Sequence, residues 1–260
     1  MFDILKARIK QGYRTMPFPK GPSPILPLNF KGCPEVNCCE CEDKKCMEPC
    51  PVSAISECHN NSRSKVKIDL GKCIFCARCA GACKHGSIRF SNNYRLSGSV
   101  RESLHIGGAN HRPLTKPLDP KRLRLFGKSL RLRQVSAGGC NACEADTNVL
   151  TTIAWDLQRF GIDFVASPRH ADGILVTGPV TKNMAYALKS TYEAVARPKV
   201  VIALGTCAIS GGLFEGHDET LDGISGLMPV DLYIPGCPPH PLTILDGLLR
   251  LTGKIDGADY

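Results

Sequence analysis

Four cysteines in the run CIFCARCAGACK have the spacing of a metal-binding motif. Cys73, Cys76, Cys79 and Cys83 are separated by two, two and three residues. Three thiolates this close together can bind three irons of one 4Fe–4S cube, and the fourth cysteine of such a run usually ligates a second cluster. Lys84 stands where a proline often follows, which removes no ligand. The run therefore predicts a partner run elsewhere in the chain.

The partner run lies upstream, in NCCECEDKKCMEPCPVSAI. We interpret Cys38, Cys41, Cys46 and Cys50 as its ligands, with Cys39 as the alternative to Cys38. The middle spacing is four residues, two more than in the downstream run. This longer step leaves the choice between the two adjacent cysteines open.

The two runs repeat each other beyond their last cysteines. CPVSAI and CKHGSI carry an isoleucine at the same distance from the cysteine, like two copies of one loop-and-turn unit. Duplication at this scale is the two-cluster ferredoxin pattern, in which each run lends its fourth cysteine to the other cluster. The predicted ligand sets are Cys38, Cys41, Cys46 and Cys83 for one cluster, and Cys73, Cys76, Cys79 and Cys50 for the other.

Disulfide bonds and zinc are the alternatives for cysteines at this density. Disulfide frameworks are typical of secreted chains, whereas MFDILKARIK is charged throughout and lacks the apolar core of a signal peptide. Structural zinc usually joins two distant C-x2-C pairs rather than runs with three short steps. We therefore expect reduced, metal-binding cysteines in the cytoplasm. No apolar stretch approaches the roughly 20 residues of a membrane helix.

The 260 residues carry a formal net charge of +9. Such a charge suggests an acidic partner surface, anionic lipid or nucleic acid. Ten lysines and arginines fall between Arg95 and Arg133, against two acidic residues. Aromatic residues are not interleaved with them as in single-strand nucleic-acid binders. We therefore expect no nucleic-acid partner, and we interpret residues 92–128 as an exposed basic linker that lies on a partner.

Residues 1–91 are predicted to form a small α+β two-cluster ferredoxin-like domain. It opens with a basic amphipathic helix candidate, which could pack on its own domain or dock on a membrane partner or lipid surface. A proline-rich strap follows, and KVKIDL and SIRF are expected to be short strands.

Residues 129–260 alternate between strand and helix candidates. Short apolar runs predict strands at 131–136, 161–167, 172–178, 199–205 and 231–236. Helices are expected at roughly 147–160, 182–197 and 239–252. This order favours an α/β domain built on an open parallel, flavodoxin-like sheet.

Four more cysteines follow the predicted strands of this second domain. They are Cys140, Cys143, Cys207 and Cys237, and each group is surrounded by glycines. The carboxyl ends of parallel strands gather at one edge of a sheet, where ligands bind. We interpret these cysteines as the ligands of a third 4Fe–4S cluster, with a zinc site, or a merely buried Cys207, as the alternatives.

The motifs GGCNACE, SPRHADGILVTGPVT, GTCAISGG and DLYIPGCPPHP give residues 131–252 a specific resemblance. Together they resemble the small, proximal-cluster subunit of membrane-bound, energy-converting nickel–iron hydrogenases, formate hydrogenlyase in particular. The homologous subunit of respiratory complex I shares the pattern. That subunit typically has adjacent cysteines where this chain has C-x2-C, so the hydrogenase branch fits better.

The first half resembles the two-cluster ferredoxin-like subunit of the same complexes, so the chain looks like a fusion of two subunits. The resemblance implies an oxidoreductase subunit that relays electrons through three 4Fe–4S clusters and has no catalytic residue of its own. Its implied partners are a hydrogenase or complex I-like large subunit, further iron–sulfur or donor subunits, and integral membrane subunits. The alternative is the equivalent subunit of a complex I-like ferredoxin or NADH:quinone oxidoreductase, or of a nickel-free hydrogenase-related complex. Either places the chain peripherally on the cytoplasmic face of the inner membrane.

Several residues near the motifs receive weaker interpretations. Cys33 and Cys58 are expected to be spare thiols near the first cluster. Glu144 and Asp146 could face the large subunit, carry protons, or be solvated turn carboxylates. For His217 and His240 we expect roles around a cluster or at an interface rather than ligation. His170 is assigned no chemistry.

Overall fold

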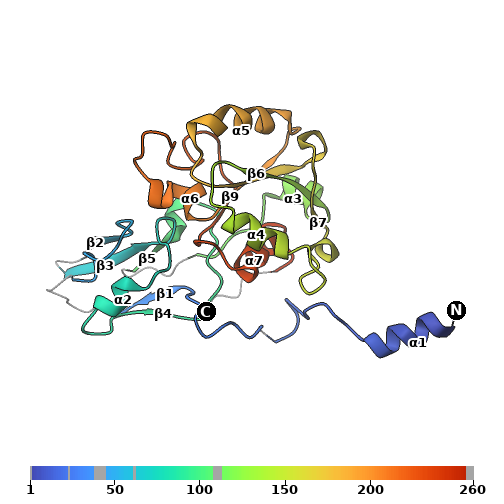
Figure 1. Ribbon diagram of the computed structural model, residues 1–260, viewed down its shortest axis with the longest axis horizontal. Coiled ribbons are helices and arrows are strands. Elements are labelled where there is room, and N and C mark those ends of the chain that lie inside the picture. Colours follow the sequence, from blue (N-terminus) through green and yellow to red (C-terminus); the bar gives the residue numbers. More distant parts are fainter. Residues whose placement is uncertain (1, 23, 38–44, 61–62, 108–112, 256–260) are drawn as a thin grey trace.

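The computed structural model describes residues 2–22, 24–37, 45–60, 63–107 and 113–255, without the side chains of 58–60 and 63–65 (Figure 1). Its larger half is a five-stranded sheet in the order β7-β6-β8-β9-β10, with every pair parallel. The strands are β6 (Leu130–Ser136), β7 (Ile162–Phe164), β8 (Gly173–Thr177), β9 (Val200–Leu204) and β10 (Leu232–Ile234). This is the flavodoxin-like order, so the predicted fold class is confirmed.

Helices cover both faces of this sheet. They are α4 (Ala142–Val149), α5 (Lys182–Ala194), α6 (Thr206–Ser210) and α7 (Pro241–Leu251). In Figure 1, α5 lies over one face, and α4 and α7 lie over the other. All five residues of β8 and of β9 are buried, as expected for parallel strands covered on both sides.

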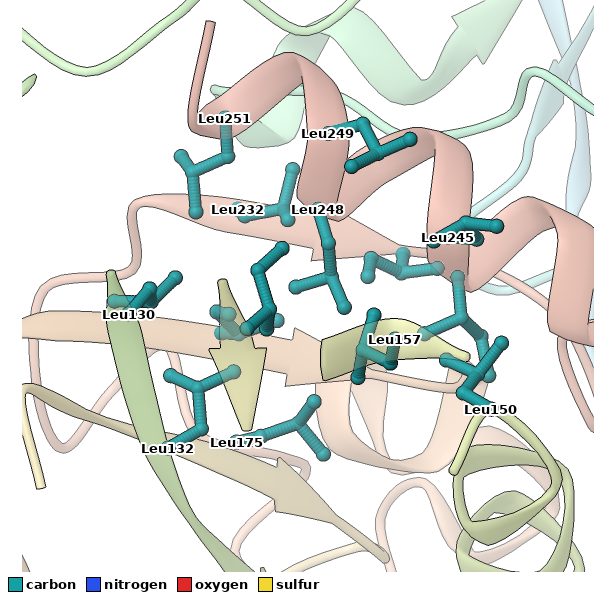
Figure 2. Close-up of a cluster of buried hydrophobic side chains, with 14 of the residues drawn as sticks. Leu130, Leu132, Leu150, Leu157, Leu175, Leu232, Leu245, Leu248, Leu249 and Leu251 are labelled. Atoms are coloured by element: carbon teal, nitrogen blue, oxygen red, sulfur yellow. The ribbon is translucent and has the colours of Figure 1, made fainter. Parts of the chain in front are cut away.

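Leucines dominate the core on the α7 side, as Figure 2 shows. Leu132, Leu175 and Leu232 from the strands meet Leu245 and Leu248 from α7, and all five are fully buried. Each such side chain contributes about 1.5–3 kcal/mol by leaving water. Every residue of α7 is buried, and a Cβ on Gly247 would lie 3.1 Å from Ser97, so residues that precede the sheet also cover this helix.

The strap joins the first half of the chain to the second. Met16, Phe18 and Phe30 pack against the α7-side core, and the backbone N–H of Met16 donates to the carbonyl of Ala154 at 2.9 Å. The strap is therefore part of the α/β half as much as of the ferredoxin-like half.

The ferredoxin-like half consists of two small antiparallel sheets. One pairs β1 (Pro34–Val36) with β4 (Ile88–Phe90), and the other has the order β2-β3-β5. The latter strands are β2 (Ile55–Asn60), β3 (Arg63–Asp69) and β5 (His105–Ile106). The short helix α2 (Arg78–Ala82) lies within the downstream cysteine run. Both predicted strands of this half are confirmed.

The predicted N-terminal helix is also present, as α1 (Phe2–Gln11). None of its residues is buried, and Figure 1 shows it projecting from the body of the molecule. It does not pack on its own domain. Among the described residues, no helix has both the length and the apolar character needed to cross a membrane.

Residues 92–107 and 113–128, the described part of the expected linker, are not uniformly exposed, so the prediction of an exposed linker is wrong there. Leu96, Leu104, Leu118 and Phe126 are buried, and Gly98 forms an antiparallel bridge with Tyr233 of β10. The segment contains the 3-10 helix η1 (Arg101–Leu104), strand β5 and helix α3 (Pro120–Phe126). Its apolar residues fall in separate short elements, so the sequence has no periodic pattern from which their burial could be predicted.

The prediction of a helix at 147–160 is wrong as well. Helix α4 begins and ends earlier, and only a 3-10 turn, η2 (Leu157–Phe160), lies at the far end. The hydroxyls of Thr151 and Thr152 donate to the carbonyls three residues before them at 2.8 and 2.7 Å. Such local hydrogen bonds compete with helix continuation.

Breaking a buried ion pair within α7 should destabilise the fold strongly. Asp246 and Arg250 are each 1% exposed, and Asp246 Oδ2 accepts from Arg250 Nε at 2.9 Å. Asp246→Asn should lower the free energy of unfolding by about 3–5 kcal/mol, because it leaves a buried guanidinium uncompensated. Anaerobic urea denaturation followed by circular dichroism measures this. The control Asp172→Asn alters an ion pair with Arg131 that is 53% exposed on the arginine side and should cost less than about 1 kcal/mol. Equal costs would contradict the prediction.

Candidate metal centres

Four cysteine thiols gather where the strands of the parallel sheet end. Cys140 follows β6, Cys143 lies in the first turn of α4, Cys207 lies in α6 directly after β9, and Cys237 follows β10. Burial, and then the nearby charges of Glu144 and of the other three cysteines, raise the pKa of Cys143, so the four predicted cysteines lie close together. The loops converge as the parallel topology requires.

Glycines let the cysteine loops approach one another closely. Gly205 has φ +87°, and a Cβ built there would lie 2.6 Å from Cys143 Sγ. A Cβ on Gly212 would lie 3.0 Å from Cys207 Sγ. Side chains at either position would occupy the space beside the sulfurs.

The thiols of this site are half shielded from water. Burial, together with the nearby charges of Cys237 and Cys140, raises the pKa of the Cys207 thiol to about 11. Burial also raises the pKa of Cys143 and of Cys237. Cys140 and Cys237 are exposed on the outer side. Metal binding here must displace thiol protons and neutralise four mutually repelling charges.

A second group of cysteines surrounds an apolar pocket in the ferredoxin-like half. The pocket is lined by Cys50, Cys73, Cys76 and Cys79, with isoleucines and Phe90 around them. Burial, together with smaller effects that include the charge of Cys50, raises the pKa of Cys73 to about 12 and that of Cys79 to about 11. Cys50 thus lies beside the downstream run, as cross-ligation requires.

The internal repeat predicted from CPVSAI and CKHGSI is confirmed. The backbone N–H of Ala54 donates to Cys50 Sγ at 3.3 Å, and that of Ser87 donates to Cys83 Sγ at the same distance. The residue before each donor is left-handed, with φ 46° at Ser53 and 61° at Gly86. Hydrogen bonds to a sulfur stabilise its thiolate form.

The remaining predicted ligand set is only partly visible. Cys46 is buried, and Cys83 packs against the same hydrophobic cluster. Burial alone would raise the pKa of Cys83, but hydrogen bonds from the backbone N–H groups that follow it outweigh this effect and lower it. Cys38, its alternative Cys39, and Cys41 lie outside the described residues.

The donor sets fit 4Fe–4S clusters by their chemistry. Soft thiolates are the preferred ligands of such clusters, and the two fully described sets, Cys50, Cys73, Cys76 and Cys79, and Cys140, Cys143, Cys207 and Cys237, each offer four. Within the described chain, no three histidine, cysteine, aspartate or glutamate side chains are grouped so as to hold a single metal ion.

The acidic and histidine candidates have distinct environments. Glu144 is 6% exposed and its Oε1 accepts from the Thr177 hydroxyl at 2.5 Å, so it is no solvated turn carboxylate. Asp146 and His240 line one pocket together with Cys237. Burial raises the pKa of Asp146 and lowers that of His240.

The histidines and the two spare cysteines have different environments. His240 Nδ1 accepts from the backbone N–H of Leu242 at 3.1 Å and so caps α7. His217 and His170 are exposed. Cys33 is half-buried, and the side chain of Cys58 lies outside the described residues.

Sequence reasoning missed two residues that join the halves. Thr206 and Ser210 of α6 donate hydroxyl hydrogen bonds to backbone carbonyls of Cys73 and Gly71, each at 2.9 Å. Their four-residue spacing next to Cys207 was the one available signal, since it places both on one helix face.

Known proteins resemble this chain in both halves. A family described as NADH ubiquinone oxidoreductase, 20 Kd subunit, matches residues 140–251, and a 4Fe-4S binding domain matches residues 66–89. An uncharacterized protein of Methanocaldococcus jannaschii is 43% identical over 50% of this chain and 88% of its own length. The probable membrane-bound hydrogenase subunit mbhJ of Pyrococcus furiosus is 39% identical over 51% of this chain and 79% of its own. An NADH-quinone oxidoreductase subunit of Citrifermentans bemidjiense is 47% identical over 45% of this chain and 68% of its own.

The close approach at Gly205 gives a test of the site after β9. Gly205→Ala should lower the iron content of anaerobically purified protein, because its Cβ would collide with Cys143 Sγ. Gly216→Ala is the matched control, since Gly216 has φ +75° and nothing within 4 Å of an added Cβ. Both variants place a side chain at positive φ, and full iron in both would contradict the geometry.

Proposed function

The chain belongs to the family of the NADH ubiquinone oxidoreductase 20 Kd subunit, and from this premise we propose that it is the electron-transfer subunit of a membrane-associated oxidoreductase complex. Each bound 4Fe–4S cluster would accept and release one electron at a time. The protein's part is to hold three such groups at fixed separations in one chain and to set their environment.

One observation carries this proposal. The cysteine site at the edge of the parallel sheet lies beside the loop that carries Cys73. Thr206, the residue before Cys207, donates a hydrogen bond to the carbonyl of Cys73. Two candidate cluster sites therefore adjoin within one folded body. The third set, Cys38, Cys41, Cys46 and Cys83, extends the series through the cross-ligated repeat.

The outer side of the sheet-edge site is open to a partner. Cys140 and Cys237 are exposed there, and Leu213 and Phe214, which follow Cys207 in the chain, are 57% and 47% exposed. A cluster in this position needs protein above it to exclude water, and exposed apolar side chains favour such a contact. We assign this face to the large subunit that holds the substrate site, so the chain itself has no catalytic residue.

We favour a nickel–iron hydrogenase of the formate hydrogenlyase type as the complex. The C-x2-C spacing of Cys140 and Cys143 supports this choice, and the relatives include a probable membrane-bound hydrogenase subunit. The second candidate is a complex I-like ferredoxin or NADH:quinone oxidoreductase, or a nickel-free relative, because a subunit of an NADH-quinone oxidoreductase is 47% identical over 45% of this chain.

We propose the remaining partners from the surface of α1 and from the family resemblance. Helix α1 exposes Phe2, Ile4, Leu5 and Ile9 beside Lys6, Arg8 and Lys10. An apolar face beside basic residues suits integral membrane subunits and an anionic membrane surface. We place the chain peripherally on the cytoplasmic face of the inner membrane, with further iron–sulfur or donor subunits at its ferredoxin-like end.

Cys237→Ser tests the relay. The change should remove the 4Fe–4S cluster nearest the proposed large subunit, since serine is a poor substitute for a soft thiolate. In the assembled complex, turnover should collapse, while rapid reduction of the two remaining clusters persists. Freeze-quench electron paramagnetic resonance and activity measure the two parts, and gel filtration of the same sample confirms assembly. Normal turnover with that cluster absent would sink the relay model.

Cys50→Ser tests the cross-ligation. It should perturb the cluster of Cys73, Cys76 and Cys79 and spare that of Cys46, and Cys83→Ser should do the reverse. Electron paramagnetic resonance spectra of each reduced variant report which cluster changes. Cys33→Ser, outside every predicted set, should change neither. If Cys83→Ser disturbs only the cluster of its own run, the ligand assignment is wrong.

A further inference from the structure

Helix α6 fits its polar face onto the loop that carries Cys73. The Thr206 hydroxyl donates to the carbonyl of Cys73, and the Ser210 hydroxyl donates to that of Gly71, each at 2.9 Å. Thr206 is 1% exposed and Ser210 is 8% exposed. Both hydroxyls are therefore shielded from water and committed to the other half of the chain.

Thr206 also touches the loop that carries Cys237. Its backbone N–H donates to the carbonyl of Gly236 at 2.9 Å, and its hydroxyl oxygen lies 3.1 Å from the same carbonyl. A hydroxyl has only one proton to donate. The shorter distance to Cys73, and the donor already present at Gly236, assign that proton to the carbonyl of Cys73.

The position of Thr206 in the chain makes this contact significant. The next residue is Cys207, and Gly236 directly precedes Cys237. From Cys73, a path runs through its own carbonyl, across one hydrogen bond, and along one residue of α6 to Cys207. The hydroxyl thus connects a cysteine of one set to a cysteine of the other.

The Cys73 loop is also held by Asp69, which precedes it. Asp69 accepts from Arg101 in a bidentate pair at 2.7 and 2.6 Å and from the N–H of Gly71 at 2.8 Å. A Cβ on Gly71 would lie 2.8 Å from Ile209 Cγ2, so α6 packs directly on this loop. Because this loop is held at Asp69 and packs on α6, the Thr206 contact sets how Cys73 lies relative to Cys207.

We infer that Thr206 is a positioning residue for electron transfer between the two sites. The inference rests on the proposed function, because it requires a cluster at each cysteine set. One electron leaves one site, which is oxidised, and enters the other, which is reduced. No bond forms or breaks and no proton moves, so the protein contributes separation, rigidity and the hydrogen-bonded link.

The test compares three variants of the full chain in its complex. Thr206→Val removes the hydroxyl at nearly constant volume, and Thr206→Ser keeps it. Ser210→Ala is the matched control, because it removes the other hydroxyl of this interface without touching a cysteine. Iron content and the midpoint potential of each cluster are measured first. Flash reduction by a photosensitiser, followed by freeze-quench electron paramagnetic resonance, then gives the rate of transfer between the two sites.

The expected result is a several-fold slower transfer in Thr206→Val, with normal iron content and unchanged potentials. Thr206→Ser and Ser210→Ala should keep the wild-type rate. The inference is overturned if Thr206→Val transfers at the wild-type rate, if Ser210→Ala slows transfer equally, or if Thr206→Val loses iron, since the hydroxyl would then serve docking or assembly. Failure of the wild-type chain to pass electrons between the sites would instead refute the proposed function.

Discussion

Thiolates placed together inside a protein repel one another, and the rest of this structure accommodates that repulsion. Burial and neighbouring charges raise the pKa of Cys73 to about 12 and that of Cys207 to about 11. Ionisation of these thiols is therefore harder than that of an ordinary cysteine. An iron–sulfur cluster reverses the situation, because its irons neutralise the thiolates. The fold must bring the cysteines together and still leave room for that group.

The two halves of the chain bring their cysteines together in different ways. The parallel sheet draws its cysteines from loops far apart in sequence, since its strands all end at one edge. The ferredoxin-like half draws them from two copies of a short loop, in which the backbone N–H of Ala54 or of Ser87 steadies the last sulfur. The segment 92–128 then locks the halves together through buried leucines and the bridge at Gly98. The sites adjoin because the chain folds as one body.

Much of this could be predicted from the sequence, because cysteine spacing and strand periodicity report local constraints. The parallel sheet, the repeat and the convergence of Cys140, Cys143, Cys207 and Cys237 all follow from such patterns. The burial of residues 92–128 could not be predicted, since its apolar side chains contact partners distant in sequence. The contact of Thr206 with Cys73 could not be predicted either, because it depends on how α6 packs on a loop that is distant in sequence.

The central claim is that one chain holds three 4Fe–4S clusters. Its most direct measurement is the iron, sulfide and zinc content of anaerobically purified protein, with Mössbauer spectroscopy to identify the cluster type. Three cubes predict about twelve iron and twelve sulfide per chain. About eight iron per chain, or zinc in stoichiometric amount, would contradict the account by removing at least one of the three sites.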